Sequence, residues 1–347
     1  MFNLESIVRP NVLKMKPYSS ARDEFKGEAS IFLDANENNL GSLAGENYNR
    51  YPDPHQKKLK TLIAEIKDVR SEQVFLGNGS DEAIDLLLRA FCRPGKDALL
   101  CLPPTYGMYE VSANLNEVRI DTVQLTADFQ IPVQEVLQTL KPETKLLFIC
   151  SPNNPTGNSI RTEDIETLLN KFSGLVVIDE AYIDFADTPS WTTRLNDFPN
   201  LVILQTFSKA WGMAGLRLGM AFASAEIIAL LDKIKPPYNI NEATQELVLQ
   251  AIDKTEVLKD MVEEIVQERE LLMQALPSIQ AVETVYPSDA NFLLVKVTDA
   301  GAMYKFLLSK GIVVRNRSGL PGCEGCIRIS VGTLEENQTL LKAMAAF

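Results

Sequence analysis

Short apolar runs alternate with segments of helical periodicity over residues 74–222. The runs are typical of buried strands, because they are brief, apolar and bounded by turn residues. Strands that alternate with helices are joined by crossovers, which favour a mostly parallel sheet sandwiched by helices. Ligands of such sheets bind beyond the carboxyl ends of the strands. The sequence therefore predicts a large α/β domain with a site along one edge of its sheet.

Several predicted strands end in a loop that carries a chemically useful side chain. These side chains are Tyr106, Asn154, Asp179 and Lys209. A lysine among apolar neighbours loses its proton more readily than a solvated one, and the free amine can form a Schiff base with a carbonyl compound. A carboxylate such as Asp179 at the end of a buried strand is costly unless it meets a cation. We expect these side chains to share one pocket, although each is also compatible with a plain surface or packing role.

A glycine-rich turn, Gly77 to Glu82, lies between a predicted strand at 74–76 and a predicted helix that ends near Phe91. Unpaired N–H groups and the helix dipole meet at such a turn and favour phosphate. Ser80 and Asp81 are equally compatible with simple helix caps.

The chain after Pro236-Pro237 differs in composition from the part before it. We predict one long helical stretch from Glu242 to about Leu276 and then short strands mixed with helices. The expected organisation is an N-terminal arm at 1–30, a large domain at 31–240 that begins with a short strand at Ile31 to Leu33, and a small α+β domain at 241–347. The small-domain strands are expected at 282–285, 291–297, 312–315 and 326–331. Arg315 and Arg328 lie on two of them, where they face either a ligand or solvent.

Charge and cysteine usage restrict the class of function. A formal charge of -12 argues against a nucleic-acid surface. The five cysteines are an odd number, as expected of free thiols in a reducing compartment. Cys323 and Cys326 have C-x-x-C spacing, but His55 is the one histidine and lies far away, so we predict no metal. The sequence shows neither a signal peptide nor a run of roughly 20 apolar residues that would span a bilayer, and a cytoplasmic protein is expected.

Together these groups describe a receptor for pyridoxal 5'-phosphate. Lys209 offers the amine, Asp179 the acid that keeps a pyridine nitrogen protonated, and Tyr106 an aromatic lid. The phosphate donors are expected at Ser80, Asp81, Ser208 and Arg217, and the oxygen partners are Asn154 and Tyr182.

The motifs S-P-N-N-P-T-G, D-E-A-Y, T-F-S-K-A and A-G-L-R-L-G occur in this order, over 151–219. With them, the chain resembles the class I and II aminotransferases of PLP fold type I. Further stretches resemble the histidinol-phosphate aminotransferases within that class; they are Pro17 to Arg22, Asp34 to Glu37, Asn49 to Pro52, Arg89 to Gly95, Pro103 to Tyr109 and Ile327 to Thr333.

The resemblance implies roles for the cofactor-side residues. Lys209 would hold the cofactor and move protons, and Asp179 would pair with the pyridine nitrogen. Asn154 and Tyr182 would contact the ring hydroxyl, and Tyr106 would stack on the ring. Ser80, Asp81, Ser208 and Arg217 would surround the phosphate, with the Asp81 side chain pointing away or capping the helix. Tyr51 would reach the phosphate of a neighbouring subunit, which implies a homodimer.

The resemblance also implies transamination between histidinol phosphate and 2-oxoglutarate, giving imidazole acetol phosphate and glutamate, in histidine biosynthesis. By this resemblance Arg328 matches the family's carboxylate-binding arginine, whose guanidinium fork fits either carboxylate or phosphate. The expected substrate-binding residues are Tyr18, Asn36, Asn291, Arg315 and Arg328.

Other functions remain open at this point. A threonine-phosphate decarboxylase shares the cofactor residues, and an aromatic amino acid aminotransferase shares the class. A transcription regulator with an aminotransferase-like domain would need a DNA-binding extension. Asn36-Glu37-Asn38 is followed by Asn39-Leu40, where the family often has a proline and an aromatic residue, and the loop that carries this departure is expected to border the pocket.

Overall fold

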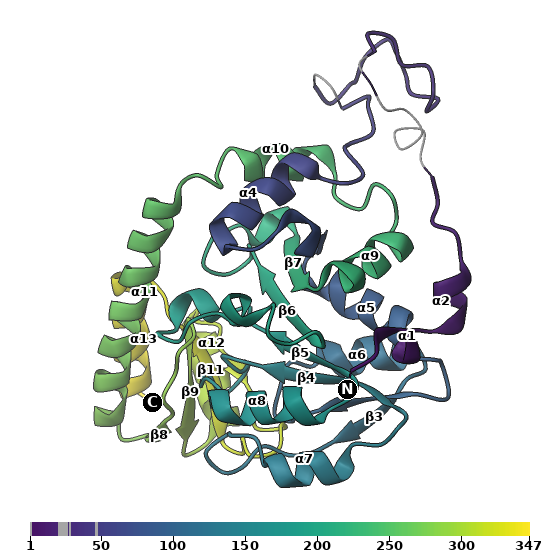
Figure 1. The fold of residues 1–347 in the computed structure, drawn as a ribbon. Helices are drawn as coiled ribbons and strands as arrows, with labels where there is room; N and C mark the ends of the chain where they lie inside the picture. The colour runs from purple at the N-terminus through teal and green to yellow at the C-terminus, as the bar shows by residue number, and fades with distance from the viewer. Residues whose placement is uncertain (1, 20–26, 28, 46–47) are drawn as a thin grey trace.

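A seven-stranded sheet forms the centre of the larger part of the molecule (Figure 1). The computed structural model describes residues 2–19, 27, 29–45 and 48–347. The sheet order is β1 (Val74–Asn78), β7 (Leu218–Ala223), β6 (Leu201–Thr206), β5 (Leu175–Asp179), β4 (Thr144–Cys150), β2 (Ala98–Cys101) and β3 (Arg119–Thr122). Strand β7 is antiparallel to its neighbours β1 and β6, and the remaining pairs are parallel. The mostly parallel sheet predicted from the sequence is confirmed.

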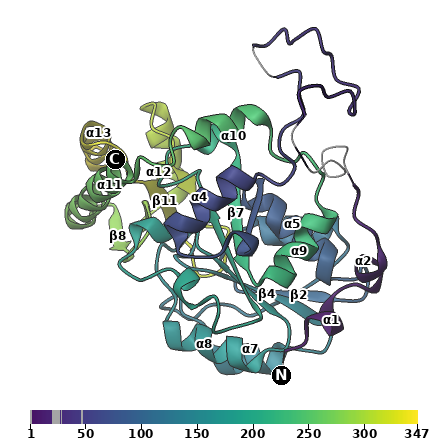
Figure 2. The same ribbon diagram turned by 45° about the horizontal axis from the view of Figure 1, so that its top comes forward.

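Side-chain alternation along the buried strands builds a core on each face of this sheet. In β5, Val176 and Ile178 belong to one core, whereas Leu175 and Val177 belong to the other. Burying one such side chain fully contributes roughly 1.5–3 kcal/mol. The first face is covered by α4 (Lys57–Lys67), α7 (Val133–Thr139) and α8 (Thr162–Lys171). The second is covered by α5 (Ser80–Phe91), α6 (Met108–Leu115) and α9 (Ala225–Ile234), with α1 (Leu4–Ile7) and α2 (Pro10–Lys14) packed beside them (Figure 2).

A smaller antiparallel sheet follows in the chain. Its order is β10 (Arg315–Asn316), β11 (Cys326–Ser330), β9 (Phe292–Val297) and β8 (Val282–Val285). Helices α11 (Thr255–Ala275), α12 (Ala300–Ser309) and α13 (Leu334–Ala345) contribute to its core. Ile327 and Ile329 of β11 point into that core, so Arg328 between them points away from it.

The remaining elements are short. They are α10 (Glu242–Leu249) and the 3₁₀ helices η1 (Ser71–Gln73), η2 (Ile183–Phe185), η3 (Trp191–Arg194), η4 (Ala214–Leu216) and η5 (Leu276–Ser278).

Three expectations about elements are wrong. Residues 31–33 form no strand, and Ile31 and Leu33 are 75% and 79% exposed because no described strand pairs with them. The helical stretch from Glu242 is two helices, since the chain turns between α10 and α11 and buries Ile252 there. The strand expected at 312–315 is reduced to β10. The domain boundaries at residues 30 and 240 stay predictions.

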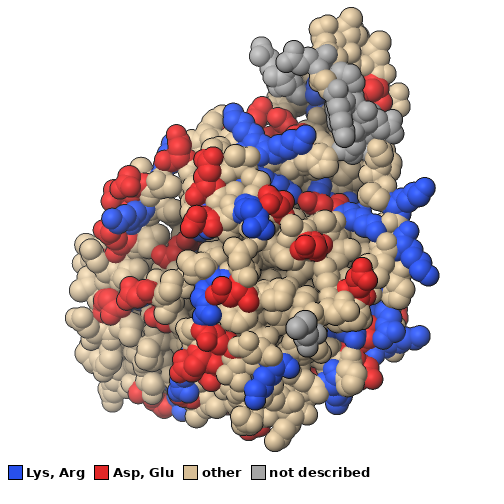
Figure 3. Space-filling view, in the orientation of Figure 1, with Lys and Arg blue, Asp and Glu red and all other residues tan. Residues whose placement is uncertain are grey.

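The surface in Figure 3 mixes both signs of charge, with Lys and Arg interspersed among Asp and Glu. Among the described residues, no helix is both long enough and apolar enough to cross a membrane.

Candidate active site

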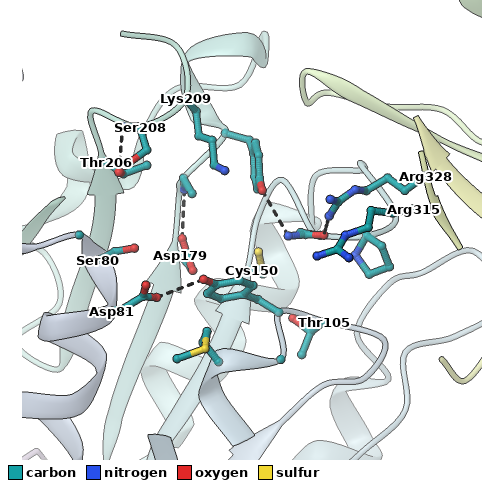
Figure 4. A pocket seen from close by; sticks show the side chains of 18 of the residues that line it. Ser80, Asp81, Thr105, Cys150, Asp179, Thr206, Ser208, Lys209, Arg315 and Arg328 are labelled. Carbon is teal, nitrogen blue, oxygen red and sulfur yellow. Dashed lines mark hydrogen bonds between the residues drawn. The ribbon is translucent and has the colours of Figure 1, made fainter. Parts of the chain in front are cut away.

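A cavity of about 530 Å³ lies where the carboxyl ends of β4, β5 and β6 meet residues of the small sheet (Figure 4). Figure 4 shows Lys209 reaching into it, with Asp179 on one side and Arg315 and Arg328 on another. The sequence-predicted residues that line it are Ser80, Asp81, Tyr106, Asn154, Asp179, Tyr182, Ser208, Lys209, Arg217, Arg315 and Arg328. The parallel strands bring Asn154, Asp179 and Lys209 together because their carboxyl ends share an edge, whereas Arg315 and Arg328 come from the antiparallel small sheet.

Asp179 is the last residue of β5 and is 2% exposed. Its Oδ2 accepts a hydrogen bond from the Tyr109 hydroxyl at 2.7 Å, and its Oδ1 accepts one from the Ala181 N–H at 3.1 Å. Burial raises the pKa of Asp179 to about 6, and the hydrogen bond from Tyr109 opposes that rise. This carboxylate is therefore fixed in place and ready for a cationic partner.

Lys209 projects from the loop after β6. Its Nζ lies 5.5 Å from the centroid of the Tyr182 ring. Burial, and then the positive charge of Arg328, lower the pKa of Lys209. The cavity therefore increases the fraction of this lysine that is a neutral, nucleophilic amine.

Asn154 connects the two sides of the cavity. Its Nδ2 donates to the Tyr182 hydroxyl at 3.2 Å, and its Oδ1 accepts from Nη1 of Arg328. Arg328 also lies over the Phe292 ring, 5.2 Å from its centroid. The amide thus orients both a phenol and a guanidinium toward one space.

Asp81 differs from its expected orientation. Its side chain was predicted to point away or to cap the helix, yet it lines the cavity. Its Oδ1 accepts a hydrogen bond from Tyr106 at 3.1 Å, and its Oδ2 lies 3.8 Å from Nη2 of Arg217. Charge attraction and the phenol donor hold the carboxylate inward, where it positions Tyr106 and Arg217.

The amino end of α5 forms a tight cradle with the lysine loop. Gly79 has φ +70°, and a Cβ on it would lie 2.6 Å from Nη2 of Arg217. A Cβ on Gly219 would lie 2.1 Å from the Ser80 nitrogen, so β7 approaches the helix end closely. First-turn N–H groups of a helix lack intrahelical partners and bind anions well. Arg217 and Ser208 complete a phosphate-sized set of donors here.

The other predicted residues lie outside this cavity in the chain. Tyr51 stacks on Tyr238 with ring centroids 4.4 Å apart. Tyr18 and Asn36 are exposed, and the backbone carbonyl of Asn291 accepts the Val331 N–H at 2.9 Å. Arg22 of the predicted arm motif lies outside the described residues.

Sequence reasoning missed two side chains that bear on the cavity. Tyr109 is fully buried and bonds to Asp179, and Arg317 lines the cavity beside Arg315. Tyr109 lies in the Pro103–Tyr109 stretch, three residues after Tyr106, and the sequence pattern assigned a role to Tyr106 alone. Arg317 is two residues after Arg315, and this spacing of residues on one face of an extended segment was the available signal.

Comparison with known proteins gives the class. The family model for aminotransferase class I and II matches residues 23–344. This chain belongs to the class I and II aminotransferases.

Its relatives agree with that class. The chain is 53% identical to a histidinol-phosphate aminotransferase of Cytophaga hutchinsonii over 100% of this chain and 99% of the relative. It is 55% identical to one of Parabacteroides distasonis, over 99% of each. The fold superposes with a TM-score of 0.80 on a histidinol-phosphate aminotransferase of Sinorhizobium meliloti solved with pyridoxal-5'-phosphate, at 25% identity, covering 90% of this chain and 89% of that one.

Pyridoxal phosphate is the cofactor of this class, and the cavity fits it. The buried Asp179 carboxylate has no cation bonded to it among the described residues, which suits a protonated pyridine nitrogen. Gly79 and Gly219 let Arg217 and strand β7 approach the amino end of α5 closely, since a Cβ on either glycine would collide with Arg217 or with the Ser80 nitrogen. Lys209 faces the same space. The cofactor predicted from the sequence is confirmed, while the individual residue roles remain predictions.

Proposed function

We propose that this enzyme transfers an amino group between histidinol phosphate and 2-oxoglutarate, giving imidazole acetol phosphate and glutamate, in histidine biosynthesis. One observation carries the proposal: the Lys209 amine and a group of arginines face each other across a single cavity. The names of the two relatives at more than half identity support the substrate.

One side of the cavity, here called the large-sheet wall, is formed by residues beside the seven-stranded sheet: Ser80, Asp81, Tyr106, Asn154, Asp179, Tyr182, Ser208, Lys209 and Arg217. This wall is proposed to hold the cofactor. Pyridoxal phosphate, when bound, supplies an electron sink for the carbon that loses its proton. Asp179 would keep the pyridine nitrogen protonated, and Tyr106 would cover the ring. Asn154 and Tyr182 would contact the ring hydroxyl.

The phosphate group of the cofactor is proposed to lie at the amino end of α5. Ser80 and Asp81 would donate backbone N–H groups there, and Ser208 and Arg217 would donate from their side chains. The Asp81 carboxylate, which accepts a hydrogen bond from Tyr106, would then form an ion pair with Arg217 and would not contact the phosphate.

Lys209 is proposed to move the proton at the reacting carbon. A general base works best when its pKa lies near the working pH, and burial shifts the pKa of Lys209 in that direction. The Tyr182 ring, whose hydroxyl accepts a hydrogen bond from Asn154, lies with its centroid 5.5 Å from this amine.

The opposite side of the cavity, here called the small-sheet wall, carries Arg315, Arg317 and Arg328. This wall is proposed to bind the anionic end of each substrate. Arg315 and Arg328 are paired across β10 and β11, which places their side chains on one face. A guanidinium accommodates both phosphate and carboxylate as a fork. The same arginines would therefore accept histidinol phosphate in one half-reaction and glutamate in the other.

The absorbance of the cofactor-loaded enzyme tests this function. Histidinol phosphate without any keto acid is expected to bleach the yellow band, and 2-oxoglutarate is expected to restore it. Release of carbon dioxide from threonine phosphate, with histidinol phosphate leaving the band unchanged, would assign the chain to the decarboxylases. Bleaching by phenylalanine but not by histidinol phosphate would favour an aromatic aminotransferase.

We also propose that the enzyme works as a homodimer with shared sites. The segment around residues 29–45 projects from the body in Figure 1, and it exposes Ile31, Leu33, Leu40 and Leu43. Exposed apolar clusters mark protein interfaces. Tyr51 lies outside the cavity of its own chain, which suits a residue that completes the partner's site.

Light scattering during gel filtration tests the dimer. Twice the mass of one chain is expected, and a monomer with full activity would refute the shared site. The cytoplasmic location remains a proposal, supported by five buried free cysteines.

A further inference from the structure

A third arginine, Arg317, lines the cavity beside the two that the family motif points to. It follows β10 directly, and its backbone N–H donates to the Cys326 carbonyl at 2.8 Å. This bond closes the base of the loop 317–326. Arg317 therefore enters the cavity from the same hairpin that carries Arg315 and Arg328.

The loop that carries Arg317 is firmly anchored. Successive turns run through it, with Leu320 N–H bonded to Arg317 O, Cys323 N–H to Leu320 O and Cys326 N–H to Cys323 O, at 2.9–3.0 Å. Cys323 and Cys326 are fully buried in the core that includes the first face of the large sheet. The backbone of Arg317 is thus held in place before any ligand arrives, which reduces the entropy cost of ordering the loop on binding.

The guanidinium of Arg317 is poorly satisfied within the chain. Its Nε is buried and has no hydrogen-bond partner among the described residues. Among those residues, neither Arg315, Arg317 nor Arg328 forms an ion pair. Burial first, and then the charge of Arg315, lower the pKa of Arg317. Three neighbouring cations without an ion pair in the described part of the chain favour an anion that carries more than one negative charge.

We propose that Arg317 distinguishes the phosphate of the amine substrate from the carboxylate of its keto-acid partner. This inference rests on the proposed function of the same cavity. A phosphate monoester carries about 1.5 to 2 negative charges near pH 7 and three acceptor oxygens. A carboxylate carries one charge and two oxygens, which a single guanidinium fork can occupy. Arg317 supplies the donors and the charge that the phosphate needs and the carboxylate does not.

The variant Arg317→Gln tests the proposal in the cofactor-loaded enzyme. The KM for histidinol phosphate is expected to rise about 10- to 100-fold, because a hydrogen-bonded charge is lost. The KM for 2-oxoglutarate is expected to change less than about 3-fold. Arg317→Lys keeps the charge but not the fork and should fall between the two. Arg119→Gln removes an exposed arginine elsewhere and controls for net charge.

A binding measurement separates failure of this inference from failure of the proposed function. Calorimetry of the loaded enzyme with inorganic phosphate and with glutarate requires no turnover, and the cofactor already fills its own phosphate site. Arg317→Gln should weaken phosphate at least about 10-fold and leave glutarate nearly unchanged. Equal weakening of both ligands, or of neither, overturns the role of Arg317. A wild-type enzyme that binds phosphate through Arg317 but never turns over histidinol phosphate refutes the proposed function alone.

Discussion

The two walls of the cavity differ in how far the chain provides hydrogen-bond partners for its own charged side chains. On the large-sheet wall, Asp179 accepts two hydrogen bonds and Asp81 contacts both Tyr106 and Arg217. On the small-sheet wall, Arg317 keeps a buried donor without a partner among the described residues. The two carboxylates of the large-sheet wall are therefore held by hydrogen bonds before any ligand binds. The backbone of the small-sheet wall is also fixed, but among the described residues its three arginines have no acidic side chain paired with them.

This difference matches what each wall is proposed to do. A cofactor stays bound through every turnover, so its residues gain from fixed hydrogen bonds. Substrates alternate, so their residues must accept two different anions. Substitutions on one wall should therefore change different properties from substitutions on the other.

Replacing Lys209 with alanine should remove the chemistry of the large-sheet wall. The transamination rate is expected to fall about 10⁴-fold, at the upper end of what proton transfer contributes. Steady-state assay with histidinol phosphate and 2-oxoglutarate measures the fall. Circular dichroism should be unchanged, and a variant that retains a tenth of the rate would assign the proton transfer elsewhere.

Replacing Arg328 with alanine should mainly damage the small-sheet wall, although it also removes a hydrogen bond to Asn154 and one of the charges that lower the pKa of Lys209. The KM values of both substrates are expected to rise about 10²-fold, since a buried charge partner is lost. The yellow cofactor band should be retained. Loss of affinity for just one of the substrates would show that they do not share this arginine.

Replacing Asp179 with asparagine should lower the transamination rate about 10²-fold, because the pyridine nitrogen loses its carboxylate partner. The same change has a second effect in the cofactor-free protein. The folded pKa of about 6 lies above the ordinary value of 3.8. The native state therefore binds more protons between these values, and stability falls as pH rises.

Urea unfolding of the cofactor-free protein measures that second effect. Relative to Asp179→Asn, the wild type should lose up to about 3 kcal/mol between about pH 4 and 6, and no more at higher pH. A wild type that gains stability over this range would contradict the buried, partly destabilised carboxylate.

Replacing Tyr109 with phenylalanine should have the smallest effect of the four. It removes one donor to Asp179 and keeps the ring that stacks on Phe148 at 4.6 Å. The free energy of unfolding is expected to fall by about 1–3 kcal/mol, and cofactor affinity about 10-fold. Titration of the cofactor-free variant with pyridoxal phosphate checks this. A tyrosine that serves packing alone would leave the affinity unchanged.

Much of the large-sheet wall was predictable from the sequence. Asp179, Asn154 and Lys209 each follow an apolar run, and parallel strands bring their ends to one edge. The contact between Tyr109 and Asp179 was not predictable, because it joins α6 to β5 through tertiary packing. The local sequence does not indicate whether Tyr106 or Tyr109 points toward the Asp179 carboxylate.

The small-sheet wall and the N-terminal segment were harder to predict. Arg317 enters the cavity because a loop of successive turns holds it there, and turn geometry of this kind is weakly written in sequence. Residues 31–33 have a strand-like pattern yet form no strand. Their apolar side chains are suited to burial against the proposed partner subunit. A short apolar run of this kind has the same pattern as a buried strand, so the sequence alone predicts a strand.

A crystal structure of the enzyme with pyridoxal phosphate and histidinol phosphate tests the division between the walls most directly. We predict that the pyridine nitrogen will lie within hydrogen-bond distance of Asp179. We also predict that the substrate phosphate will lie between Arg315, Arg317 and Arg328. A substrate phosphate bound elsewhere, with the three arginines contacting solvent, would contradict this division.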